Sequence, residues 1–470
     1  PDPMPPVPQK ERVTSPYGFR HYFNYCTFNY TAAWWDWKRW EREIDFMALN
    51  GINMPLALTG QNIIWYRVYR RLGFTDKELE SFFSGPAYFI WFWMGNLDGW
   101  GGPLSKSFMR YHKRLQKKIL RRERELGMTP VLPSFTGHVP PAFKDRYPDV
   151  DVNLVQWGEG CDIAPPTYIM SPEEPMFMEI GRMFLEEQTR VFGTDHLYSA
   201  DSFNEMTPPS NDSTYLNGVA DKVYRSMSQV DPEAVWVMQG WMFGYQRDIW
   251  DPQSVEALLS GAPDDRMMVI DLAVDFNNYV WKNGNSWDNL NGFYGKSWIW
   301  STVPNFGGRT ALKGPLDFYL NGHIDALESV NKGRLSGFGT SPEGVENNEI
   351  LYELISAAAW SDSRIDLDTF LDSYDKARYG VADPAFTKFW SGLRQSVYDN
   401  FTNNARFIWQ QRPAYHRGET MNINQHYFDG IEAFLSVADT YKDNELYVTD
   451  AVQYAALYIA AKADYALKAA

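Results

Sequence analysis

The sequence predicts an α/β fold, a (β/α)8 TIM-like barrel followed by an all-α helical domain. Short runs rich in β-branched and aromatic residues alternate with longer amphipathic stretches through most of the chain. Eight such runs can be recognised, which is the number that a closed barrel requires. From about residue 349 onward the strand-like runs stop and helical spacing dominates, so a helical domain is expected there.

The length of the chain predicts more than one domain. Its 470 residues exceed what a single hydrophobic core usually holds. We expect a proline-rich leader or linker over residues 1–19, a catalytic barrel over residues 20–348 and an α-helical domain over residues 349–470.

The first half of the barrel begins with a strand, a helix and a second strand. Apolar residues at helical spacing, among them Trp40, Ile44 and Met47, predict a helix over Trp34–Asn50. Gly51 is a typical residue to end that helix. The strands predicted in this half are Tyr22–Thr27, Ile52–Ala57, Thr129–Phe135 and His196–Phe203.

Helices are predicted between the strands, and four more strands follow. A basic helix around Arg110–Arg124 precedes the third strand, and a helix over Ser213–Ser228 follows the fourth. The remaining predicted strands are Ala234–Gln239, Met267–Ala273, Ser297–Val303 and Leu335–Thr340.

Composition and charge restrict the partners of the protein. The formal net charge of −15 would repel phosphate backbones and anionic lipid, so nucleic acid is not expected as a partner. The chain has no stretch of eighteen apolar residues, so no membrane span is expected. With 19 Trp, 28 Tyr and 29 Phe, many rings should line a cleft as well as a core. A homo-oligomer stays open.

Two carboxylates just beyond strand-like runs are the candidate catalytic groups. Glu205, in Asn204-Glu205, follows the fourth predicted strand, and Glu343, in Pro342-Glu343-Gly344, follows the eighth. In TIM barrels the catalytic groups lie on loops that leave the carboxyl ends of strands. Cleavage of a glycosidic bond uses two carboxyl groups that flank the anomeric carbon. The pattern therefore indicates a sugar-cleaving enzyme with a carbohydrate substrate.

Each carboxylate also has a simpler structural interpretation, such as a helix cap or a salt bridge. A Glu205 that is partly desolvated by aromatic rings would have a raised pKa and could serve as a general acid. Glu346 and Glu349 are alternatives to Glu343, but they are better placed to cap the following helix. Many retaining barrel glycosidases carry the second carboxylate after strand seven, so a miscounted strand stays open.

Metal and cofactor chemistry has little support in the sequence. Seven histidines include no His-Glu-X-X-His motif and no His/Cys pair at ligand spacing, so no metal and no cofactor are expected. No Gly-X-Ser-X-Gly motif occurs either. His138, at the end of the third predicted strand, is a candidate substrate-binding residue. Contact with the substrate and ordering of the loop are both open interpretations.

Long motifs in a fixed order between about Arg20 and Arg378 carry a family resemblance. They include Asn24-Tyr-Cys26-Thr, Trp34-Trp-Asp-Trp, Met47-Ala-Leu-Asn-Gly-Ile-Asn, Phe-Asn204-Glu205-Met, Gln239-Gly-Trp241, Asn305-Phe-Gly-Gly and Pro342-Glu343-Gly. Together they resemble glycoside hydrolase family 89, the α-N-acetylglucosaminidase family. The resemblance implies retaining hydrolysis of terminal, non-reducing, α-linked N-acetylglucosamine, with no metal or organic cofactor.

The resemblance also implies a role for individual residues. It makes Glu205 the acid/base and Glu343 the nucleophile of a double displacement. The pocket residues that it implies are Asn24, Cys26, Tyr30, Trp91, Trp157, Asn204, Trp241, Leu272 and Val303. Without the resemblance, the three tryptophans fit equally well as core at the barrel mouth, and Cys26 fits as a small buried apolar side chain.

Substrate stereochemistry gives an independent reason to expect an enzymic nucleophile. The C2 acetamido group is cis to an α-leaving group and cannot attack from the back, so a protein carboxylate is needed. The two carboxyl groups should then lie about 5–5.5 Å apart. An inactive carbohydrate-binding protein with the same cleft, or another exo-glycosidase specificity, stays open.

Some features differ from the family pattern. Thr340-Ser341 stands where Met-Ala is common, which could alter the floor of the pocket. We also expect the small α/β domain that usually precedes the barrel to be missing and the helical domain to be partial. Family usage implies export in a bacterium, to the periplasm or the outside, and the lysosome in a eukaryote.

Overall fold

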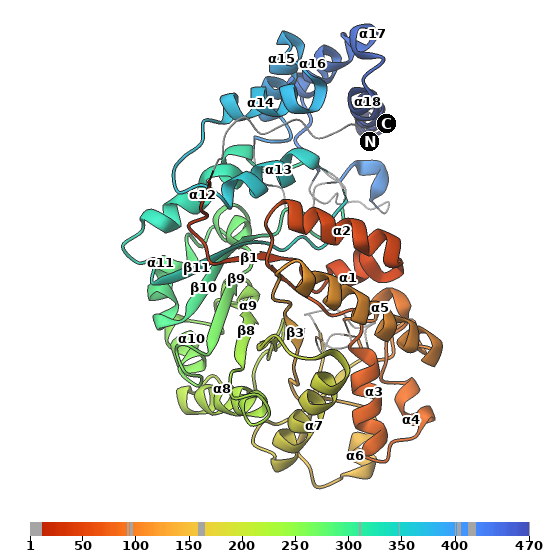
Figure 1. Ribbon diagram of the computed structural model, residues 1–470, viewed down its shortest axis with the longest axis vertical. Coiled ribbons are helices and arrows are strands. Elements are labelled where there is room, and N and C mark those ends of the chain that lie inside the picture. The colour runs from red at the N-terminus through yellow and green to blue at the C-terminus, as the bar shows by residue number, and fades with distance from the viewer. Residues whose placement is uncertain are drawn as a thin grey trace.

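The computed structural model describes residues 12–91, 94, 97–157, 165–309, 312–346, 348–399, 401, 406–411 and 420–469. Most of the leader expected over residues 1–19 lies outside these ranges. The described residues form a parallel β-barrel surrounded by helices, with a group of helices at one end, drawn in blue in Figure 1. The predicted fold class, a TIM-like barrel followed by helices, is confirmed.

Eight parallel strands form the barrel in the order β2-β1-β11-β10-β9-β8-β7-β3. A parallel bridge between Leu56 and Val131 closes the ring, and the backbone N–H of Ala57 donates to the carbonyl of Val131 at 2.9 Å. The barrel strands are β1 (Phe19–Tyr22), β2 (Met54–Pro55), β3 (Leu132–Pro133), β7 (Leu197–Ser199), β8 (Val235–Gln239), β9 (Met267–Asp271), β10 (Ser297–Thr302) and β11 (Arg334–Thr340).

Helices cover the outside of the barrel and continue into the C-terminal region (Figure 1). Around the barrel lie α1 (Thr27–Tyr30), α2 (Trp37–Leu49), α3 (Asn62–Arg71), α4 (Asp76–Glu80), α5 (Lys106–Glu125), α6 (Phe143–Arg146), α7 (Pro175–Phe192), α8 (Ser213–Ser228), α9 (Trp241–Tyr245), α10 (Pro252–Leu259), α11 (Ser286–Asn289) and α12 (Leu316–Glu328). The later helices are α13 (Glu349–Ala358), α14 (Leu367–Tyr379), α15 (Pro384–Arg394), α16 (Gln425–Leu435), α17 (Ala438–Tyr441) and α18 (Glu445–Ala469). Short helical turns are η1 (Ala32–Trp34), η2 (Pro86–Tyr88), η3 (Phe276–Val280), η4 (Asn291–Gly295) and η5 (Ile408–Gln410).

Helix α2 illustrates why the sequence patterns were informative. The Asp36 side chain caps its first turn by accepting the backbone N–H of Arg39, and Trp40, Ile44 and Met47 form its buried face. The chain leaves the helix through Gly51, whose φ of 70° favours glycine. The helix expected over residues 34–50 is therefore confirmed, apart from its first turn.

The first predicted strand was placed too late in the sequence. The strand is Phe19–Tyr22, and Thr27–Tyr30 is the helix α1 instead of the end of a strand. Phe23 has a φ of 84°, and the Asn24 side chain accepts the backbone N–H of Cys26. These two local features turn the chain out of the barrel directly after Tyr22.

A small antiparallel sheet, which the sequence patterns did not predict, lies between β3 and α7. It consists of β4 (His138–Val139), β6 (Thr167–Met170) and β5 (Val152–Val155), in the order β4-β6-β5. Its strands are short, and half of β5 is exposed, so they carry no long apolar run. The sheet stands on the loop that follows the third barrel strand.

The strand count bears directly on the two candidate carboxylates. In chain order β7 is the fourth barrel strand and β11 the eighth, so Glu205 and Glu343 follow the strands that the sequence indicated. No strand was miscounted. Both glutamates lie beyond the carboxyl ends of their strands, where catalytic groups of this fold are placed.

The C-terminal helices build a second aromatic core. Phe386, Phe389, Phe434 and Tyr447 are buried and pack on one another across α15, α16 and α18. Helix α13 packs on the barrel helix α12, so the two regions are joined without a separate linker domain. Among the described residues no helix is both long enough and apolar enough to cross a bilayer.

Candidate active site

A pocket of about 270 Å³ opens where the loops leave the carboxyl ends of the barrel strands. Almost every loop at this end of the barrel contributes to it. The lining residues are Asn24, Cys26, Tyr30, Trp91, Met94, Trp157, Asn204, Glu205, Gln239, Trp241, Leu272, Phe306, Gly307, Arg309 and Glu343. The pocket therefore brings Glu205 and Glu343 together from positions far apart in the sequence.

Glu205 is held in the pocket by two indole groups. The Nε1–H of Trp157 donates to its Oε2 atom at 2.6 Å, and the Nε1–H of Trp241 donates to its Oε1 atom at 2.9 Å. Glu205 has a φ of 52° and Phe203 a φ of 62°, so the loop after β7 is strained at two non-glycine positions. Such strain is typical of loops that aim a functional side chain.

Burial raises the pKa of Glu205 above the ordinary glutamate range. The two indole N–H groups act in the opposite direction, because they stabilise the charged form. Among the described residues, no cation is one of the groups that shift this pKa. Its raised pKa allows the carboxyl group to carry a proton, as a general acid requires.

Glu343 is fixed by the backbone of the neighbouring loop after β10. Its backbone N–H donates to the carbonyl of Asn305 at 2.9 Å, and its Oε2 atom accepts the backbone N–H of Gly307. A Cβ atom on Gly344 would lie 3.0 Å from the Cα atom of Gly308. The Pro-Glu-Gly motif thus needs glycine, because two backbones approach closely there.

Burial also raises the pKa of Glu343, to about 7. The N–H of Gly307 lowers it, the charge of Glu205 raises it, and the cations Lys313 and Arg309 lower it. The two carboxyl groups are therefore close enough to influence each other's ionisation.

Residues that follow β1 form the wall beside Glu343. The thiol of Cys26 donates a hydrogen bond to Glu343, and burial raises the pKa of this thiol well above its usual value. Cys26 is a free cysteine in the structure, whereas Cys161 lies outside the described residues. The protonated thiol acts here as a weak donor to the carboxylate.

Aromatic rings enclose the pocket on two sides. Tyr30 packs edge-on against Trp91, with ring centroids 5.3 Å apart, and Trp91 lies 5.8 Å from Trp157. On the other side Trp241 stacks on Phe306 at 6.1 Å. Such rings offer apolar faces for a sugar, while Asn24, Asn204, Gln239, Arg309 and the two carboxyl groups supply polar atoms.

Two predicted substrate-binding residues lie outside this lining. His138 is fully buried beneath Trp65 and Phe82, and its Nε2 atom hydrogen-bonds Asp98 at 2.6 Å. Val303 is also fully buried. Its backbone N–H donates to the carboxylate of Asp275 at 3.0 Å, underneath the loop that carries Gly307. Both residues therefore hold loops of the site in place from behind the pocket lining.

The positions that differ from the family pattern also lie beneath the pocket. Thr340 and Ser341 are buried, and neither is among its lining residues. The Ser341 hydroxyl hydrogen-bonds the Ser301 hydroxyl at 2.9 Å. Thr340-Ser341, in place of the Met-Ala that is common in the family, therefore alters the packing under Glu343 and not the pocket lining.

Sequence reasoning did not assign five of the lining residues, namely Met94, Gln239, Phe306, Gly307 and Arg309. Four of them belong to or adjoin the motifs Gln239-Gly-Trp241 and Asn305-Phe-Gly-Gly. Those motifs were therefore the signal for these positions. Met94 lies between η2 and α5, outside the motifs on which the sequence analysis depended.

The site offers two carboxyl groups and no metal cluster. Within the described ranges, no three His, Cys, Asp or Glu side chains come together as a metal ion would require. Two carboxyl groups across an aromatic-lined pocket can donate a proton and supply a nucleophile or base.

Comparison with known proteins points in the same direction. The family model described as the alpha-N-acetylglucosaminidase TIM-barrel domain matches residues 20–362, and the model for its C-terminal domain matches residues 370–470. The human alpha-N-acetylglucosaminidase is 41% identical over 401 residues, which cover 85% of this chain and 53% of the human protein.

Two solved structures from Clostridium perfringens are similar over nearly the whole chain. One is a family 89 glycoside hydrolase in complex with 2-acetamido-1,2-dideoxynojirmycin, with a TM-score of 0.85 and 28% identity. The other is a variant with two Glu-to-Gln substitutions in complex with its substrate GlcNAc-alpha-1,4-galactose, with a TM-score of 0.85 and 27% identity. Each match covers 97% of this chain and 51% of the other.

Proposed function

The chain belongs to the α-N-acetylglucosaminidase family, glycoside hydrolase family 89, and from this we propose that it hydrolyses terminal, non-reducing, α-linked N-acetylglucosamine with retention of configuration. The chain spans about half the length of these relatives, 53% of the human protein and 51% of the Clostridium chains. Its substrate and mechanism are therefore inferred from the site.

In the proposed first step, Glu205 protonates the glycosidic oxygen while Glu343 attacks C1 from the opposite face of the sugar. The bond between C1 and the leaving oxygen breaks as the bond between C1 and the Glu343 carboxylate forms. In the second step Glu205 deprotonates a water molecule, which attacks C1 and releases Glu343. Two displacements at one carbon return the product to the α-configuration.

The single observation that carries the proposal is that Glu205 and Glu343 line one pocket in different electrostatic surroundings. Lys313 and Arg309 lower the pKa of Glu343, whereas within the described part of the chain the pKa of Glu205 is lowered by indole donors alone. When the two carboxyl groups together hold one proton and that proton is on Glu205, Glu205 is neutral. Its negative charge then no longer raises the pKa of Glu343. The cations then keep Glu343 ionised, as a nucleophile requires.

The substrate-free site also contains an opposing influence. Burial brings the pKa of Glu343 to about 7, and the indole donors favour a charged Glu205. Below neutral pH some of the free protein therefore carries a proton on Glu343. The proposed assignment requires that substrate binding shift this proton from Glu343 to Glu205. The glycosidic oxygen favours that shift, because it accepts a hydrogen bond from the protonated Glu205.

Substrate chemistry adds further support. In an α-linked N-acetylglucosaminide, the acetamido group lies on the same side as the leaving group and cannot perform the back-side attack. The Clostridium variant that holds its substrate carries two Glu-to-Gln substitutions, which agrees with a mechanism that depends on two glutamates.

Product NMR on an aryl α-N-acetylglucosaminide tests the proposal in one spectrum. We expect α-N-acetylglucosamine as the first product, before mutarotation. The β-anomer as first product would indicate inversion and overturn the mechanism. Absence of turnover on α-N-acetylglucosaminides, together with binding of the sugar, would favour a carbohydrate-binding protein, and turnover of other aryl hexosaminides would favour another exo-glycosidase specificity.

A further inference from the structure

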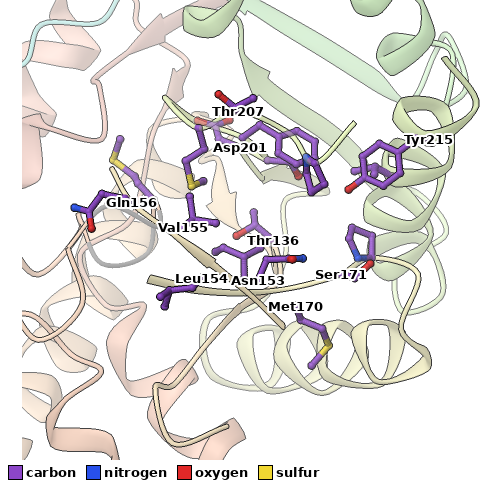
Figure 2. Close-up of a pocket in the computed structure, with 18 residues that line it drawn as sticks. Thr136, Asn153, Leu154, Val155, Gln156, Met170, Ser171, Asp201, Thr207 and Tyr215 are labelled. Atoms are coloured by element: carbon purple, nitrogen blue, oxygen red, sulfur yellow. The ribbon is translucent and has the colours of Figure 1, made fainter. Parts of the chain in front are cut away.

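Two cavities lined by loops of the barrel hold little positive charge. Arg309 is the one cation among the described lining residues of the catalytic pocket. A second cavity, of about 390 Å³, shares Met94 with that pocket and lies between the hairpin of β5 and β6, the loop after β7 and helix α8 (Figure 2). Its described lining residues include Asp201 and neither Lys nor Arg. Positive charge is concentrated instead on the outer face of helix α5.

Helix α5 carries a stripe of cations on its exposed side. Figure 1 shows this helix on the outside of the barrel, beside α2 and α3. The cations repeat at three- and four-residue spacing, which places them on one face of a helix. This cationic stripe consists of Arg110, Lys113, Arg114, Lys117, Lys118 and Arg121. It is about 16 Å long, because a helix rises about 1.5 Å per residue.

Most cations of the stripe have no carboxylate beside them. Arg121 pairs with Glu125 at 3.7 Å, and farther along the helix Arg124 pairs with Asp195 at 2.5 Å. Among the described residues, the other five cations of the stripe have no carboxylate at ion-pair distance. In a protein with a formal net charge of −15, the stripe is therefore a local reversal of charge.

The stripe is unfavourable for the helix itself. Arg110 and Arg114 stand four residues apart, as do Lys113 and Lys117, and like charges at this spacing destabilise a helix. Desolvation lowers the pKa of Lys113, and neighbouring cations lower it further. Those cations are Arg67, Lys117, Arg114 and Arg190. An anionic ligand along the stripe would relieve this repulsion.

An exposed indole links the stripe to the rim of the candidate active site. Trp34 is 71% exposed and packs edge-on against Phe108, in the first turn of α5, with ring centroids 6.4 Å apart. It follows Tyr30, a residue of the pocket lining, by four positions. Tyr111, beside Arg110, adds a second exposed ring. Aromatic faces next to cations suit sugar rings that carry acidic groups.

The geometry fits a linear polymer better than a membrane. Apolar side chains of α5 such as Met109, Leu115 and Ile119 are buried against the barrel, so they cannot insert into a bilayer. A flat anionic surface would also face the rest of an acidic protein. A polymer that follows the stripe avoids this repulsion, because exposed charges more than about 10 Å away are largely screened.

The chain belongs to a glycoside hydrolase family, which favours a polysaccharide as the polymer. We propose that the cationic stripe and Trp34 form a second, non-catalytic glycan-binding surface, which holds a linear polysaccharide that carries carboxylate or sulfate groups. The sugar rings lie on Trp34 and the acidic groups on the stripe. The inference goes beyond the proposed function, because hydrolysis of a small glycoside in the pocket needs no contact with α5.

Binding of three polymers to the whole chain tests the proposal. Dextran sulfate carries sulfate groups, polygalacturonate carries carboxylates, and dextran carries neither. At physiological ionic strength we expect the acidic polymers to bind at least about tenfold more tightly than dextran, with an affinity that falls as salt is added. Binding of one acidic polymer alone would identify the acidic group that the surface takes. Equal binding of all three polymers would overturn the proposal.

A triple variant removes the centre of the stripe. Arg110→Gln, Arg114→Gln and Lys117→Gln together should lower the affinity for the acidic polymer by at least about tenfold. The melting temperature should not fall, because the variant removes like-charge pairs from α5. A loss of binding in this variant therefore reports the surface and not the fold.

The matched control is Lys376→Gln, Lys388→Gln and Lys442→Gln, which removes the same charge from exposed positions of the C-terminal region. Its affinity for the acidic polymer should equal that of the wild-type protein. An equal loss of affinity in the two triple variants would show that net charge alone decides binding, and would overturn the proposed surface.

Trp34→Ala tests the aromatic part of the surface. Loss of a ring on which a sugar stacks should lower the affinity for the acidic polymer by about threefold or more. Trp409→Ala removes an indole that is 51% exposed in the C-terminal region and should leave the affinity unchanged. An unchanged affinity in Trp34→Ala would overturn the place of Trp34 in the surface.

Other anionic partners are tested with vesicles of phosphatidylserine and phosphatidylcholine and with an oligothymidylate. We expect both to bind more weakly than the acidic polysaccharide. Tighter binding of either, lost in the triple variant of the stripe, would assign the surface to a membrane or a nucleic acid and overturn the glycan. If the wild-type protein hydrolyses no α-N-acetylglucosaminide, the proposed function falls, and the binding results still decide this inference.

Discussion

The indole Nε1–H of Trp157 lies 2.6 Å from the Oε2 atom of Glu205, so a residue beside the small antiparallel sheet holds a carboxylate on the loop after β7. Trp157 lies two residues beyond the end of strand β5. The small sheet is therefore part of the candidate active site, because it delivers one of the two donors that fix Glu205.

Trp157→Phe should keep the ring but remove the N–H donor. The loss of a donor to the charged form raises the pKa of Glu205, so the alkaline limb of the kcat/KM profile should move to higher pH. We also expect kcat/KM to fall by about tenfold, because the carboxyl group is less well positioned. Trp37→Phe on α2 is the control, and an identical pH profile in both variants would contradict this role.

Glu343→Ala should abolish turnover of an aryl α-N-acetylglucosaminide, with a loss of at least about a thousandfold in kcat/KM. Added azide should then give the β-glycosyl azide, since it replaces the missing nucleophile in a single displacement. In Glu205→Ala, azide should give the α-glycosyl azide by attack on the covalent intermediate. NMR of the azide products determines their configuration. An α-azide from Glu343→Ala and a β-azide from Glu205→Ala would show that the two roles are reversed.

The acid limb of kcat/KM should report ionisation of Glu343. A nucleophile must be ionised, so activity falls as pH drops through its pKa, which burial raises to about 7 in the free protein. Arg309→Gln removes a cation that lowers this pKa, and the acid limb should therefore move to higher pH. Arg225→Gln on the surface of α8 is the charge-matched control. A limb that moves to lower pH in Arg309→Gln would contradict the assignment.

Glu123 on α5 should make stability depend on pH. It is fully buried, neither of its carboxyl oxygens has a partner within the described residues, and burial raises its pKa from 4.5 to about 8. Because the folded pKa is raised, its contribution to stability is complete below pH 4.5 and is lost as the pH rises toward 8.

Glu123→Gln replaces the buried carboxyl group with an amide that does not titrate, so the pH-dependent cost of burial at this position disappears. The variant should gain about 4 kcal/mol in the free energy of unfolding at pH 8 and above, as a pKa rise from 4.5 to about 8 implies, and nothing at pH 4. Glu125→Gln, exposed on the same helix, should change little at either pH. Urea unfolding at the two pH values measures this, and an equal effect of Glu123→Gln at both would contradict it.

Much of the barrel could be predicted from the sequence because its signals are local. The strands β8, β9, β10 and β11 and the helix α8 lie within a few residues of their predicted bounds, since apolar periodicity and turn residues act over short spans. The first strand was placed wrongly because the left-handed Phe23 and the Asn24 turn interrupt a run that reads as continuous. The sheet of β4, β5 and β6 escaped prediction because its strands are short and partly exposed.

The sequence by itself determined the fold class and the positions of Glu205 and Glu343 after their strands, because these are encoded by residues that lie close together in the chain. Most of the pocket lining was implied by the resemblance to the family. Only the tertiary structure decided which groups meet. It placed Trp157 and Trp241 on Glu205, set Arg309 and Lys313 near Glu343, removed His138 to the interior and opened a second cavity beside Met94. The physical reason is that hydrogen bonds, charge interactions and burial depend on distance in space, which closing the ring of strands sets and sequence separation does not.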